Sequence, residues 1–145
     1  MYALVRYRGD YMHLDANKEI FVSSSKILLN NVKKFIELKI ISGEYAAGDR
    51  IPSRREFSNE YNVGETTVSK AFAELCDDGI LICRKGTGFY VRPYIKELLL
   101  NTHLKELKKS MSNVIMDGIN LGLDDMEIVE MFEQVFKEHR YVNSL

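Results

Sequence analysis

Short polar and charged side chains cluster between residues 65 and 70. They are Glu65, Thr66, Thr67, Ser69 and Lys70. Side chains of these types can reach base edges or phosphates when one α-helix lies in the major groove of DNA. Lys70 is a candidate for a phosphate or guanine contact, and Glu65 could accept a hydrogen bond from a cytosine amino group. The chemistry that this segment suggests is recognition of nucleic acid.

Simpler interpretations of the same residues stay open. Glu65 would stabilise the positive end of a helix dipole without any ligand. Thr66 and Thr67 could cap the start of the helix, and for Thr67 capping and DNA contact are equally supported. An ordinary helical hairpin would show much the same pattern, so the neighbouring segments must decide between these interpretations.

A second group of candidate residues follows in Arg84, Lys85, Gly86 and Thr87. Short β-prone runs stand on either side of them, at 80–83 and 89–91, which predicts a β-hairpin with a basic, glycine-bearing tip. A nucleotide-binding loop would need a third glycine and would lead from a strand into a helix. A hairpin directly after a DNA-reading helix is instead typical of a wing that lies on the DNA backbone.

Two helices are expected to position these groups. Ser53 and Glu56 form a capping box at the start of the first helix, and Phe57 and Tyr61 give that helix its buried side. The turn at 62–64 then leads into a helix over 65–78. Its apolar stripe consists of Val68, Phe72 and Leu75, and Gly79 supplies its left-handed C-terminal position. Two helices joined by a short glycine-containing turn indicate a helix-turn-helix.

Arg55 lies on the first of these helices and is another candidate for a phosphate or guanine contact. Its alternative role is a surface ion pair with Glu56 or Glu60, which would contribute little to stability. The net charge of the chain is only −1, but residues 1–92 hold 14 Lys and Arg against 12 Asp and Glu, while residues 93–145 hold 6 against 9. The weak excess of basic residues therefore lies in the part proposed to bind DNA.

A known family shares many of these positions at the same spacings. The matching positions are Ile41-x-Gly43, Gly48-Asp49-x-Ile51-Pro52-Ser53-x-Arg55-Glu56, Val63, Thr67-Val68, Leu75, Gly79-Ile80 and Gly86-x-Gly88-x-x-Val91. On these positions, residues 36–92 resemble the DNA-binding head of the GntR family of bacterial transcription regulators, and residues 67–71 resemble its YtrA-type branch. The resemblance implies an α+β fold, in which a winged helix-turn-helix domain is followed by a two-helix C-terminal dimerisation region. It also implies that Arg55 contacts DNA.

The chain departs from the family pattern at Glu65 and Ser69, where much of the wider family carries arginines. The YtrA-type branch also often has Pro-Asn where Glu65 and Thr66 stand. This departure keeps a second class of function open, a winged-helix module that binds protein without binding DNA. A third class is a sensor of small molecules or metals that uses a dimer interface as its pocket.

Three regions are expected along the chain: an N-terminal extension over 1–25, the winged helix-turn-helix domain over 26–92 and a helical dimerisation region over 93–145. In the extension, residues 2–7 and 11–14 could pair as a small hairpin through a turn at 8–10. The hairpin would pack on the domain or form an arm that touches DNA with Arg6 and Arg8. Ser25 is the expected N-cap of a helix over 26–42.

The last region reads as a long amphipathic helix to about residue 119, a break at 120–123 and a final helix whose start is capped by Asp124 and Glu127. The expected dimerisation residues lie on one side of each helix: Leu100, Leu104, Leu107, Met111, Val114, Phe132, Val135 and Phe136. Two helices cannot bury both apolar faces alone, so a second copy of the chain is the expected partner. The alternative is a monomer in which the helices pack on their own domain.

Other functional classes find no support in the sequence. Its start does not resemble a signal peptide, and no apolar stretch approaches the length of a membrane span, so a cytoplasmic protein is expected. His13, His103 and His139 lie far apart, which predicts no metal site and no cofactor. Cys76 and Cys83 are expected to be small buried side chains. No catalytic arrangement is present, so the expected function is a dimeric transcription regulator, a repressor at a near-palindromic operator, with an effector left open.

Overall fold

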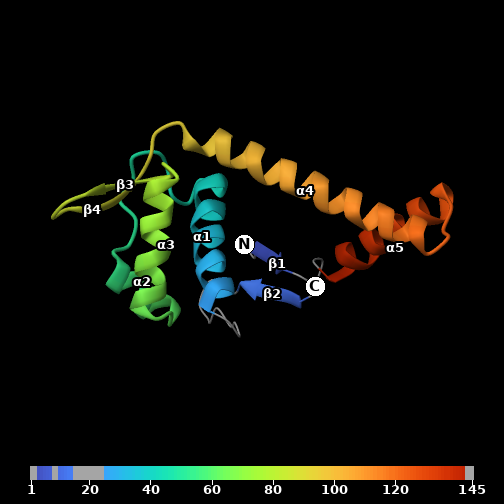
Figure 1. Cartoon of the computed structure of the whole chain (residues 1–145), viewed down its shortest axis with the longest axis horizontal. Helices are drawn as coiled ribbons and strands as arrows, with labels where there is room; N and C mark the ends of the chain where they lie inside the picture. Colours follow the sequence, from blue (N-terminus) through green and yellow to red (C-terminus); the bar gives the residue numbers. More distant parts are fainter. Residues whose placement is uncertain (1–2, 8–9, 15–24, 143–145) are drawn as a thin grey trace. The chain divides into compact units, whose positions relative to one another are not determined.

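The computed structural model describes residues 3–7, 10–14 and 25–142. In chain order its elements are β1 (Ala3–Tyr7), β2 (Asp10–Leu14), α1 (Ser25–Ser42), α2 (Arg54–Tyr61), α3 (Glu65–Asp77), β3 (Leu81–Arg84), β4 (Gly88–Val91), α4 (Ile95–Asn120) and α5 (Asp125–Val142) (Figure 1). They form two compact units, Met1–Leu100 and Asn101–Leu145. The predicted fold class, a winged helix-turn-helix followed by two helices, is confirmed.

Helices α1, α2 and α3 share one core built around aromatic rings that meet edge to face. The ring centroids of Phe35 and Phe57 are 5.9 Å apart, and those of Phe57 and Phe72 are 5.6 Å apart, both edge to face. Phe89 extends the series from β4, at 4.9 Å from Phe72. Each such pair contributes about 0.5–1.5 kcal/mol beyond the area that it buries. The three helices and the second strand of the wing are therefore held together by one set of rings.

Helix α2 begins and ends where local side chains require it. The Ser53 hydroxyl accepts a hydrogen bond from the Glu56 N–H at 3.2 Å, and the Glu56 carboxylate accepts one from the Ser53 N–H at 2.6 Å. This is the predicted capping box. At the other end Asn62 takes the left-handed conformation, with φ of 51°. Asparagine tolerates this region better than most residues, so the chain can turn sharply from α2 into α3.

Helix α3 ends one residue earlier than predicted, and Asp78 is its C-cap. Gly79 follows with φ of 74°. Its N–H donates to the carbonyl of Cys76 at 3.0 Å, while the N–H of Ile80 donates to the carbonyl of Leu75 at 2.9 Å. These two bonds define a Schellman motif, which needs a left-handed residue at this position. The predicted role of Gly79 is confirmed.

The wing consists of β3 and β4, which pair antiparallel with Leu81 opposite Val91 and Arg84 opposite Gly88. A third segment joins them, because Arg50 forms a bridge to Tyr90. The N–H of Ile51 donates to the carbonyl of Phe89 at 2.9 Å. The extended segment before α2 therefore supports the wing.

The N-terminal strands β1 and β2 pair as an antiparallel hairpin, with Ala3 opposite Leu14 and Tyr7 opposite Asp10. A hairpin in this segment was expected from the sequence. The side chains of Arg6 and Arg8 lie outside what the structure describes, so neither the packing of the hairpin nor an arm on DNA is tested. Ser25 is the first residue of α1 and not the residue before it.

In the second unit α4 and α5 meet around a turn at Leu121–Leu123. The N–H of Asp124 donates to Glu127 Oε2 and the N–H of Glu127 donates to Asp124 Oδ1, both at 2.9 Å, which completes the predicted cap. A side chain at Gly118 would come within 3.1 Å of Ile128. This close approach explains the glycine, and Ile128 is the buried residue of α5.

Candidate nucleic-acid interface

A groove of about 730 Å³ lies between the start of α2, the start of α3 and the wing. It is lined by five cationic side chains, Arg50, Arg54, Arg55, Arg84 and Lys85. A single carboxylate, Glu65, faces it. Such an excess of positive charge in one concave surface attracts phosphates. We call this surface the basic groove.

The structure brings seven of the ten predicted DNA-contacting residues together in the basic groove. They are Arg55, Glu65, Ser69, Arg84, Lys85, Gly86 and Thr87. The other three, Thr66, Thr67 and Lys70, lie on α3 but do not line it. Thr66 and Lys70 are exposed and Thr67 is half-buried. The predicted residues thus divide between the basic groove and the adjoining exposed face of α3.

One side of α3 is buried in the core, and the opposite side, which we call the open face, is exposed to solvent. Val68, Ala71, Phe72 and Leu75 are completely buried in the core. Gly64 is the N-cap, and no side chain hydrogen-bonds to the cap. Capping is therefore not what Thr66 and Thr67 do in this structure. The N-terminal N–H groups of α3, with the positive end of its dipole, are available to an anion such as a phosphate.

Two cations of the basic groove were missed by the sequence analysis. Arg50 Nε donates to the carbonyl of Thr87 at 3.1 Å, and the Arg54 guanidinium lies 5.8 Å from the centre of the Phe89 ring. Both side chains therefore contact the wing. Arg54 stands beside Arg55 in the sequence, which was the available signal. Arg50 had no comparable signal, because its partner is 37 residues away.

The tip of the wing is shaped by glycines. Gly86 has φ of 78° and Gly88 has φ of 125°. The positive φ of Gly88 favours glycine, and a Cβ atom there would lie 2.9 Å from Nε of the flexible Arg50 side chain, which would have to shift. The N–H of Thr87 donates to the carbonyl of Arg84 at 3.0 Å and closes the turn.

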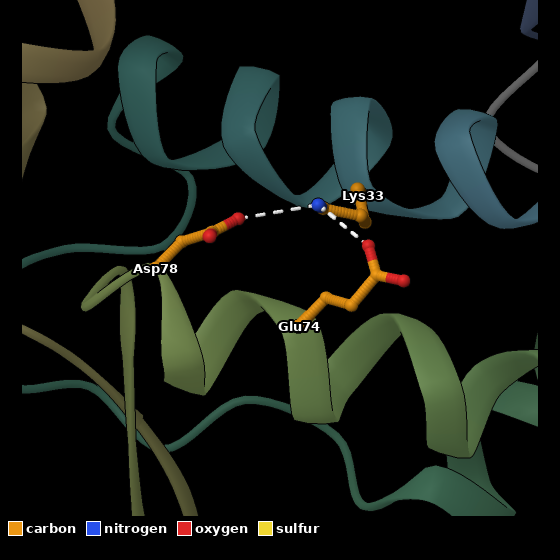
Figure 2. Close-up of polar contacts among 3 residues, drawn as sticks. All are labelled: Lys33, Glu74 and Asp78. Carbon is orange, nitrogen blue, oxygen red and sulfur yellow. Dashed lines mark hydrogen bonds and ion pairs between the residues drawn. The ribbon is translucent and has the colours of Figure 1, made fainter.

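Figure 2 shows Lys33 of α1 between two carboxylates of α3. Its Nζ lies 2.8 Å from Glu74 Oε2 and 3.2 Å from Asp78 Oδ2. Burial lowers the pKa of Lys33, but the hydrogen bonds to Glu74 and Asp78 outweigh burial and leave this pKa above its ordinary value. The C-terminal end of a helix carries partial negative charge and disfavours acidic residues. Lys33 offsets that charge and fixes the acidic end of α3 against α1.

Comparison with known proteins agrees with this geometry. The family model for bacterial regulatory proteins of the gntR family matches residues 28–91. The solved structure of a GntR family transcriptional regulator from Listeria monocytogenes is 30% identical, with a TM-score of 0.66, over 78% of this chain and 98% of that one. The chain belongs to the GntR family. It is a DNA-binding transcription regulator with a winged helix-turn-helix domain.

Relatives of this GntR-family chain differ in how much of their length they share with it. The repressor YtrA of Bacillus subtilis is 27% identical over 78% of this chain and 86% of its own length. A probable fructoselysine utilization operon repressor of Escherichia coli is 36% identical, but the chain spans only 28% of its length. A transcriptional regulator from Oenococcus oeni, 20% identical with a TM-score of 0.66, shares the fold.

The expectation that both cysteines of this regulator are buried was wrong. Cys83 is exposed, whereas Cys76 is half-buried. Strand β3 starts in the core at Leu81 and ends exposed at Arg84 near the tip of the wing. Cys83 therefore lies in the exposed part of the strand, outside the apolar interior. Burial raises the pKa of the Cys76 thiol above its ordinary value.

The residues that the structure describes contain neither a metal-binding cluster nor a membrane-spanning helix. Within them, no three His, Cys, Asp or Glu side chains come close enough to hold a metal ion. None of the helices over the same residues combines the length and the apolar character that crossing a membrane requires.

Proposed function

We propose that this GntR-family chain is a homodimeric transcription repressor that binds a two-fold-symmetric DNA operator in the cytoplasm. The observation that carries the proposal is the basic groove, which lies directly beside the open face of α3. The repressor role is proposed because its relatives include the repressor YtrA of Bacillus subtilis and a probable fructoselysine utilization operon repressor of Escherichia coli.

Two kinds of DNA contact are assigned to the basic groove and its surroundings. Arg55, Arg84 and Lys85 contact phosphates, with Gly86 and Thr87 at the tip of the wing close to the backbone. The open face of α3 reads base edges in the major groove through Glu65, Thr66, Thr67, Ser69 and Lys70. Because phosphate contacts release counterions, binding weakens steeply as the salt concentration rises.

The dimer is assigned to an apolar seam on α4 and α5. On α4 it consists of Leu100, Leu104, Leu107, Met111 and Val114, whose spacing of four and three residues is that of a helix-packing seam. On α5 it consists of Phe132, Val135 and Phe136. All except Phe132 are exposed in the single chain, and Phe132 is half-buried. Exposed apolar side chains in such a number mark an interface, and a second copy of the chain covers them symmetrically.

Selection from a random-sequence DNA pool tests the proposal. The wild-type chain should enrich a near-palindrome, since a two-fold dimer places two copies of α3 in successive major grooves. Replacing Arg55 or Lys70 by alanine should weaken binding to the selected site by about 1–3 kcal/mol. The matched control is Lys109→Ala, because Lys109 is an exposed lysine of α4 on the side opposite the apolar seam.

Two outcomes would contradict the proposal. If the pool shows no enrichment, the chain does not read DNA sequence, and the protein-binding module becomes the better explanation. If Arg55→Ala and Lys70→Ala both bind as well as Lys109→Ala, the DNA-contacting surface lies elsewhere.

A further inference from the structure

A second cavity, of about 390 Å³, lies where the wing leads into α4. It is formed by the end of α1, the loop at 43–47, the end of β4 and the first residues of α4. All its residues belong to the first unit, and none of them lines the basic groove. We call it the junction pocket. Its volume is in the range of small-molecule sites.

The lining of the junction pocket combines apolar walls with a few charged residues. Ile40, Val91 and Ile95 belong to the buried core and close its apolar side. Arg92 and Lys96 supply two cations, against the single carboxylate of Glu97. Apolar walls with a few polar groups are the usual composition of a ligand site. We propose that the junction pocket binds a small organic anion with an apolar, ring-sized body and one carboxylate or phosphate.

Tyr94 provides an independent reason to expect a ligand. Its φ is 64°, in the left-handed region that a bulky side chain rarely adopts. Tyr94 is one of the residues that line the junction pocket, and it is 95% exposed. Strained backbone of this kind concentrates at sites of ligand binding and switching. A ring-bearing ligand would pack against this otherwise exposed aromatic side chain.

The side chains of the two cations lie beside different glycines. Lys96 Nζ lies 3.8 Å from the position of a Cβ at Gly43, beside the end of α1. Arg92 Nε lies 3.7 Å from the corresponding position at Gly79, and the N–H of Arg92 donates to the carbonyl of Ile80 at 3.0 Å. Among the residues that the structure describes, neither side chain forms an ion pair with a carboxylate. Lys96 is therefore available to an anionic ligand in the junction pocket, whereas the Arg92 side chain lies beside Gly79, which does not line it.

Occupancy of the junction pocket changes operator affinity, because the pocket lies on the only covalent path from the wing to the helices that carry the apolar seam. This regulatory consequence rests on the proposed function. Binding of the anion to the junction pocket does not rest on the proposed function, and it can be measured without DNA. The two claims can therefore fail separately.

Titration followed by amide NMR tests the site in the full chain. The probes are phenyl phosphate and benzoate, and the uncharged control is benzyl alcohol. Both anions should cause saturable changes in the amide chemical shifts of Gly43, Tyr94 and Lys96. The anion with the lower dissociation constant identifies the preferred acidic group. Lys96→Gln should weaken the affinity for each anion at least about tenfold. The matched variant Lys109→Gln, on the far side of α4, should leave both affinities unchanged.

A second variant separates ligand binding from folding. Ala47 is exposed and lines the junction pocket, so Ala47→Trp should fill the cavity and abolish binding while leaving the fold intact. The proposal is overturned if neither anion gives saturable shifts, if Lys96→Gln binds like Lys109→Gln, or if benzyl alcohol binds as tightly as the anions. If the anions bind at the predicted residues but no operator is selected, the site stands and the proposed function fails.

Discussion

The two units of this protein use apolar side chains in opposite ways. In the first unit Phe72 is completely buried among the rings of the core, whereas in the second unit Phe136 is 65% exposed. Ile128 is the buried apolar side chain among the described residues of the second unit. The first unit is therefore complete within one chain. The second presents the kind of surface that needs a partner.

The largest effect on stability is expected when a buried and an exposed phenylalanine are each replaced by alanine. Phe72→Ala should destabilise the protein by about 3–5 kcal/mol, because it removes a large ring from a closed core. Phe136→Ala should cost less, and its cost should grow with protein concentration, because the ring would be buried only in the proposed dimer. Urea denaturation at several concentrations measures both. Equal, concentration-independent losses would show that the two units do not differ as described.

Charge placed on the apolar seam should separate the two copies. Leu107→Glu combined with Met111→Glu puts carboxylates into the proposed interface and should give a single-chain mass by light scattering. Loss of the second DNA contact should then weaken operator binding about 100-fold. Lys109→Glu, on the opposite side of α4, should leave both properties unchanged. A double variant that keeps the wild-type mass would move the interface elsewhere.

Removal of the cation between α1 and α3 should have a smaller effect, confined to the first unit. Lys33→Met keeps the apolar stem and removes the charge, so stability should fall by about 1 kcal/mol, the upper range for such ion pairs. The pKa of Lys33 lies above its ordinary value of 10.5. Its contribution is therefore fully present below pH 10.5 and is lost as the pH rises through the folded-state value. Wild type and variant should converge in alkaline denaturation curves.

The smallest effect should come from acid titration of the α2 cap. The backbone hydrogen bond from Ser53, followed by the side-chain bond, lowers the pKa of Glu56 below its ordinary value of 4.5. A lowered pKa contributes stability above the unfolded-state value, and that contribution is lost as the pH falls through the folded-state value. The stability difference between wild type and Glu56→Gln should therefore shrink on acidification. A difference independent of pH would show that the carboxylate is not bonded in solution.

Features set by neighbouring residues were predictable from the sequence. The caps at Ser53 and Asp124 and the left-handed Gly79 depend on residues within one helical turn, and each was expected at its observed place. The wing was predicted from two β-prone runs on either side of a glycine-bearing tip. These features position most of the candidate DNA contacts, which explains why seven of the ten meet in the basic groove.

Features set by distant residues were not predictable in this way. Lys33 meets Glu74 across 41 positions of sequence, and Arg50 meets Thr87 across 37. No local pattern marks either pair. The exposure of Cys83 depends on how far β3 extends beyond the core, which the alternation of its residues does not reveal. The junction pocket likewise depends on the approach of α1 and α4 within the first unit.

The mass of the complex with a selected operator duplex tests the central claim most directly. Sedimentation equilibrium of the full chain with this duplex should give two chains per duplex, because each half-site takes one copy of α3 and one basic groove. The same stoichiometry should hold with Lys109→Ala. A complex that contains one chain per duplex at full affinity would contradict the account.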